Sequence, residues 1–67
     1  MDPNERLRFA QMAVEEAYRL VRAQEAEVER MRLAGLDISR AETLLRAYKE
    51  GVRLAEQQVV LVVRSFW

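Results

Sequence analysis

The sequence predicts an all-α protein, an antiparallel hairpin of two helices over about residues 3–34 and 38–66, in a single domain 1–67. Residues 4–34 contain no Gly or Pro, residues 36–67 contain one glycine, Gly51, and no Pro, and both segments have the composition of helices. Apolar residues recur in a seven-residue repeat in both segments, as in a coiled coil. The connection is only about four residues long, and so short a loop makes two helices antiparallel neighbours.

Both helices begin with capping signals. Asp2 is followed by Glu5, and Ser39 by Glu42, which is the spacing of a capping box. Asp37 is a competing cap for the second helix, two residues earlier. These signals place the two helix starts close to residues 3 and 38.

The first helix is expected to end at Gly35. A glycine just past a helix adopts the left-handed conformation in which the last carbonyls find partners. Leu36 then folds back on Met31 as in a Schellman motif. The turn is therefore predicted at Gly35–Leu36.

The repeat predicts which residues form the core of the hairpin. Folding the chain at the turn pairs Val21 with Val52 near the middle, and the other layers follow by stepping along the helices in opposite directions. No layer falls out of register, so one hairpin accounts for both repeats. The predicted core positions are Leu7, Ala10, Val14, Ala17, Val21, Gln24, Val28 and Met31 with Ile38, Ala41, Leu45, Tyr48, Val52, Ala55, Val59, Val62 and Phe66.

One predicted core layer is polar. Gln24 and Tyr48 meet in it, an amide facing a hydroxyl. A polar site inside a bundle is one interpretation. The interpretation we favour is a pair that sets the register of the helices, as single polar core residues do in coiled coils.

One hairpin is too small to complete its own core. Chains of this length bury only about 60% of their unfolded surface, and without Cys or His the remaining aid is oligomerisation. Apolar residues such as Ala13, Leu20 and Leu44 widen the stripe beyond a single seam. We therefore expect a homodimeric four-helix bundle, with a tetramer as the alternative. Gly51 either receives a large side chain such as Tyr18 of a partner or is a tolerated flaw.

The end away from the turn is expected to be an interaction surface. Its outward positions are apolar, and a contiguous apolar patch marks a contact site. A larger self-interface, a protein partner and attachment to a membrane surface are the three interpretations, in that order. The predicted surface comprises Phe9, Met12, Val60, Leu61, Val63, Phe66 and Trp67.

Composition argues against catalysis and cofactor binding. Without His and Cys there is no thiol nucleophile, imidazole base or zinc motif, and no core position is acidic. Eleven basic residues balance eleven acidic ones, which disfavours a nucleic-acid binder. An RNA- or DNA-binding bundle stays as the alternative function, and it requires a shared face of Arg19, Arg22, Arg46, Lys49 and Arg53. No segment reads as an export signal, so a cytoplasmic location is expected.

The turn region carries a resemblance. The stretches Arg32-Leu-Ala-Gly-Leu-Asp37 and Ala41-Glu-Thr-Leu-Leu45 resemble a group of small uncharacterised alphaproteobacterial helical-hairpin proteins, over about residues 20–56. Many of that group have His after the glycine, where this chain has Leu36. The resemblance implies a hairpin fold and no activity. The architecture is also similar to the plasmid regulator Rop, a dimer of hairpins that binds paired RNA loops, as an analogy of fold alone.

Overall fold

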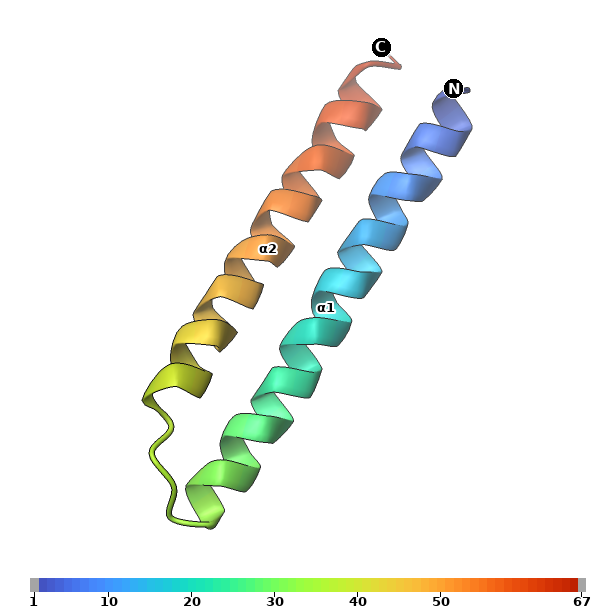
Figure 1. Cartoon of the computed structure of the whole chain (residues 1–67). Helices are drawn as coiled ribbons and strands as arrows, with labels where there is room; N and C mark the ends of the chain where they lie inside the picture. Colours follow the sequence, from blue (N-terminus) through green and yellow to red (C-terminus); the bar gives the residue numbers. More distant parts are fainter. Residues whose placement is uncertain (1, 67) are drawn as a thin grey trace.

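The chain folds into a hairpin of two long antiparallel helices. The computed structural model describes residues 2–66, in which α1 spans Pro3–Leu33 and α2 spans Ser39–Arg64. The molecule is a rod of 51 × 14 × 13 Å with both termini at one end and the turn at the other (Figure 1). The predicted all-α hairpin is confirmed, and each predicted helix end lies within two residues of the observed one.

The start of α1 is capped by Asp2. The carboxylate oxygen Oδ1 of Asp2 accepts the backbone N–H of Asn4 at 2.8 Å, and Pro3 occupies the first helical position. A proline fits there because its missing N–H would have no helical partner. The carboxylate bonds Asn4 rather than the N–H of Glu5 that a capping box uses.

The end of α1 is the predicted Schellman motif. Gly35 has a φ of 73°, and its N–H donates to the carbonyl of Arg32 at 3.1 Å. The N–H of Leu36 donates to the carbonyl of Met31 at 3.0 Å, which completes the pair of bonds that defines the motif. The two bonds satisfy the last carbonyls of α1 and reverse the chain.

The start of α2 corrects one prediction. The cap residue is Ile38, and it makes no side-chain capping bond. Ser39 is already helical, and its N–H donates to Oδ1 of Asp37 at 2.9 Å, so Asp37 supplies the acceptor instead of Ser39. The predicted capping box of Ser39 and Glu42 is therefore wrong. The N–H of Glu42 donates instead to the carbonyl of Ile38 at 2.8 Å.

The repeat located the core correctly. Ala10, Val21, Ala41 and Val52 are the buried residues among those described, and all four are predicted core positions. Every other predicted core residue is half-buried except Phe66, which is exposed beyond the last turn of α2. The small number of buried residues follows from geometry, since two helices touch along one seam only.

Candidate self-association surface

Gln24 bonds across the hairpin to backbone. Its side-chain amide nitrogen Nε2 donates to the carbonyl oxygen of Ala41 at 3.0 Å, and the residue is half-buried. Tyr48 is half-buried as well. The amide therefore anchors α1 to one carbonyl of α2, which is the type of contact that a register-setting residue requires. A role for Gln24 and Tyr48 as a pair stays a prediction.

The six described residues of the predicted open-end surface are at one end but not on one face. Phe9 and Met12 come from α1 and lie at the end of the rod where α2 finishes, because the helices are antiparallel (Figure 1). Their side chains are 58% and 59% exposed. Val60, Leu61, Val63 and Phe66 are also exposed, whereas Trp67 lies outside the described residues.

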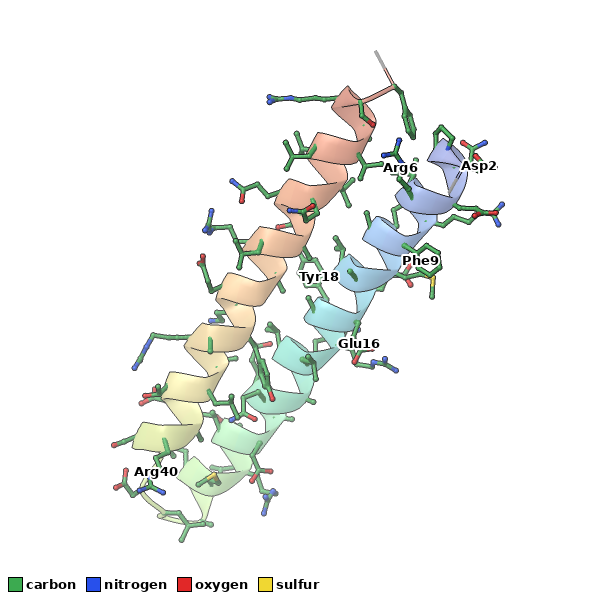
Figure 2. All side chains as sticks on the ribbon, turned by 45° about the horizontal axis from the view of Figure 1, so that its top comes forward. Asp2, Arg6, Phe9, Glu16, Tyr18 and Arg40 are labelled. Carbon is green, nitrogen blue, oxygen red and sulfur yellow. The ribbon has the colours of Figure 1, made fainter. Side chains whose placement is uncertain are left out.

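One long side of the hairpin is charged. Tyr18 lies between the helices (Figure 2), and its hydroxyl donates to Oε2 of Glu56 at 3.0 Å. This bond fixes which flank of α1 adjoins which flank of α2. Helical periodicity then places on the same side the residues one or more turns away, namely Glu15, Arg22, Glu25, Glu42, Arg46, Lys49 and Arg53.

The charges on this side are mixed in sign. The side holds four of the five basic residues that the nucleic-acid alternative requires, while Arg19 lies on the outer surface of α1. Arg19 forms an ion pair with Glu16, and Arg53 with Glu50. On the side itself, Glu15, Glu25 and Glu42 interleave with the basic residues. The side is therefore not the continuous basic stripe that nucleic-acid binding favours.

The opposite long side is apolar over α2. A shallow groove near the open end is lined by Arg6, Phe9, Ala10, Ala13, Gln58 and Val62. The groove shows that Phe9 and Ala13 of α1 share a side with Gln58 of α2. We call this the apolar side, and it comprises Phe9, Ala13, Leu20 and Ala23 of α1 with Leu44, Ala47, Gly51, Leu54, Gln58 and Leu61 of α2.

Charge is absent from the α2 half of the apolar side. From Leu44 to Leu61 its residues recur at alternating steps of three and four, and none of them is ionisable. The α1 half carries Arg6, Glu16, Glu27 and Arg30 among its apolar residues. Glu27 and Arg30 form an ion pair with each other, so these two charges are matched within the chain.

Gly51 is an open position in the middle of this side. A Cβ placed on it meets no atom of the chain within 4 Å. Nothing in the hairpin itself therefore requires a glycine there, although glycine costs about 1 kcal/mol relative to Ala inside a helix. Tyr18, the side chain expected to fill this space from a partner, is bonded to Glu56 of its own chain on the charged side.

The sequence analysis missed four members of this side, namely Ala23 of α1 and Ala47, Leu54 and Gln58 of α2. The signal was present as a second apolar row, offset by one position from the core row of α2. It became readable only when Tyr18–Glu56 and the open-end groove showed which flanks of the two helices share a side.

The described residues offer no concentrated reactive group. In residues 2–66, no three potential ligands among Asp and Glu come together in a way that could hold a metal ion. Neither helix, within the same range, has an apolar stretch long enough to cross a membrane. The chain matches no protein-family model, no curated protein and no solved structure.

Proposed function

We propose that this protein is a non-enzymatic structural module, in which two hairpins associate into a four-helix bundle. The observation that carries the proposal is the distribution of apolar side chains. Within residues 2–66 only four residues are buried, whereas large apolar residues on both helices, such as Leu20, Leu44 and Leu54, are more than a third exposed. A helix with so wide an apolar face belongs next to more than one neighbour.

The hairpin also has the form that pairs readily. Two such hairpins packed face to face place four helices in two layers around a shared core, with every neighbour antiparallel. A symmetric dimer uses the same patch on both copies, and one apolar side per copy is sufficient for it.

The open end completes the proposal. Met12, Val60 and Val63 are exposed and lie off the apolar side. A bundle formed through that side leaves them uncovered, so they are the positions that a protein partner of apolar surface is proposed to contact.

The test of self-association is the mass in solution by light scattering over a concentration series. The expected mass is twice 7.9 kDa, or four times for a tetramer. A mass of 7.9 kDa at every concentration, with full helical circular dichroism, contradicts the proposal.

Lysine substitutions separate the two surfaces. Leu61→Lys, on the apolar side, is expected to dissociate the dimer, while Val60→Lys leaves its mass unchanged. Gln57→Lys adds the same charge at an exposed position of α2 and is the matched control. If all three variants keep the mass of the unmodified chain, the apolar side is not the interface.

A further inference from the structure

We propose that the apolar side binds a second copy of this chain across a two-fold axis that lies between Val52 and Arg53 of α2 and passes Leu20 of α1. The turns of the two hairpins then lie at opposite ends of the bundle. This inference rests on the proposed self-association through the apolar side and adds the register and the direction of the partner.

The surface area of the hairpin supports a partner of its own size. The chain exposes 5302 Å². A compact monomer of this mass exposes about 4400 Å². The excess of about 900 Å² is close to the roughly 800 Å² that one partner contributes to a stable interface.

The row on α2 is complementary to itself when a second copy runs antiparallel to it. About the proposed axis, Leu54 faces Gly51 of the partner, and Gln58 faces its Ala47. Large side chains thus meet small ones, as close helix packing requires. Leu44 faces the partner's Leu61 at the two ends of the row. The empty space at Gly51 is then filled by Leu54, which is itself half-exposed in the hairpin.

The row on α1 agrees with the same axis. Val21 and Val52 are both buried at 8% exposure, and they face each other in the register that the core rows share. Two grooves match this register, since one is lined by both Val14 and Val59 and the other by Ala10 and Val62.

Leu20 therefore lies level with the axis, and it meets the partner's Leu20. Stepping outward from it, Glu16 faces the partner's Ala23. The ring of Phe9 faces the guanidinium of the partner's Arg30, a cation–π arrangement. The row on α1 is therefore compatible with the axis that the row on α2 gives.

The charged side is a poorer interface. A second copy placed there would remove charged residues of both helices from water, whereas on the apolar side only the α1 row carries charges, and unpaired charges are costly to bury. A different arrangement through the apolar side, with the two turns at the same end, sets α1 on the partner's α2 and serves as the competing outcome.

An exchange of two side chains tests the register. Gly51→Leu places a leucine against the partner's Leu54, and the dimer dissociation constant is expected to rise about tenfold or more. Leu54→Gly removes the side chain that packs against the partner's Gly51, and it is also expected to weaken the dimer. The double variant Gly51→Leu/Leu54→Gly has the same composition as the natural chain and restores a large residue facing a small one. It is expected to return the dissociation constant to within about threefold of the natural value.

A double variant that dimerises no more tightly than Gly51→Leu alone overturns the register. Circular dichroism of each variant at low concentration shows whether the hairpin itself is folded. Positions 51 and 54 lie in the same helix, so the double variant keeps one glycine inside α2, as the natural chain does. A recovery of dimerisation in the double variant therefore reports on the facing of the two positions.

A spin label tests the direction. The sequence contains no cysteine, so Leu36→Cys places one label at each turn. Turns at opposite ends give a label separation of about 48 Å, because each turn lies about sixteen residues of 1.5 Å from the axis. Turns at one end give about 10–20 Å, the width of packed helices. A short distance in a stable dimer overturns this inference and leaves the proposed self-association intact, whereas a monomer overturns both.

Discussion

The hydroxyl of Tyr18 donates a hydrogen bond to the Glu56 carboxylate at 3.0 Å and joins two helices whose bonded residues are 38 positions apart. This contact and the open-end groove on the opposite side orient the two helices about their own axes. They distinguish a charged side from an apolar side, and that distinction carries the proposed dimer.

The bond predicts an unusual titration of Tyr18. The hydrogen bond to Glu56 and the negative charge of that carboxylate raise the pKa of Tyr18 above 10.0. Absorbance at the tyrosinate band in a Tyr48→Phe background isolates this residue. Glu56→Gln is expected to lower the pKa, because the amide carries no charge.

The contribution of the same bond to stability is lost only in alkaline solution. Because the folded pKa of Tyr18 is the higher one, its contribution is fully present below the unfolded value and is lost as pH rises through the folded pKa. An identical titration of Tyr18 with and without the Glu56 carboxylate contradicts the contact.

Acid is predicted to weaken the hairpin. Hydrogen bonds from Arg30 lower the pKa of Glu27, those from Arg53 lower the pKa of Glu50, and the backbone N–H of Ser39 lowers the pKa of Asp37. Each carboxylate stabilises the fold above its unfolded pKa, and its contribution is lost as pH falls through the lower folded value.

Thermal unfolding between pH 5 and pH 2 measures this loss, and the melting temperature is expected to fall toward the acid end. Glu27→Gln/Glu50→Gln removes two of the three carboxylates and is expected to flatten the dependence. A variant with the full slope of the natural chain shows that these pairs do not contribute, as is common for exposed ion pairs.

The assignment of the core predicts that Leu→Ala lowers the free energy of unfolding more at Leu45 than at Leu33. Leu45→Ala removes a half-buried side chain of the seam and is expected to cost about 2 kcal/mol in the free energy of unfolding. Leu33→Ala is the matched control, because Leu33 is 75% exposed, and it is expected to stay within about 0.5 kcal/mol. Urea denaturation followed by circular dichroism measures both, and equal costs contradict the assignment of the core.

Gln24 is expected to affect specificity more than stability. Gln24→Leu keeps the volume and loses the bond to the Ala41 carbonyl, so the free energy of unfolding is expected to stay the same or rise. The amide region of an NMR correlation spectrum is expected to show additional peaks, because the helices can slide to other registers. Gln57→Leu, at an exposed position, is the control. A single set of sharp peaks for Gln24→Leu rules out the register role.

The left-handed conformation of Gly35 predicts that replacing this glycine lowers the free energy of unfolding. A Cβ on Gly35 meets nothing within 4 Å, so any loss in Gly35→Ala comes from its φ of 73°. The expected cost is about 1–2 kcal/mol. Gly35→Asn is expected to lose less, because Asn tolerates the left-handed conformation better than Ala. An alanine variant as stable as the natural chain contradicts this explanation of the turn.

The fold followed from local rules. The heptad spacing identified Ala10, Val21, Ala41 and Val52 as core, and Gly35 marked the turn, because helix periodicity and the left-handed C-terminal conformation depend on neighbouring residues alone. The start of α2 was less predictable. Asp37 and Ser39 both suit a cap, and the choice between them depends on how the turn leaves Gly35.

The sequence by itself determined two helices, their ends to within two residues and the row of residues between them, since each is set by local signals and periodicity along one chain. Tertiary structure decided the rest. The contacts between the helices show that Phe9 and Leu20 of α1 lie on the same side as Ala47, Gly51 and Leu54 of α2. Periodicity fixes the faces of each helix, but which flanks become neighbours depends on the direction in which the second helix packs against the first.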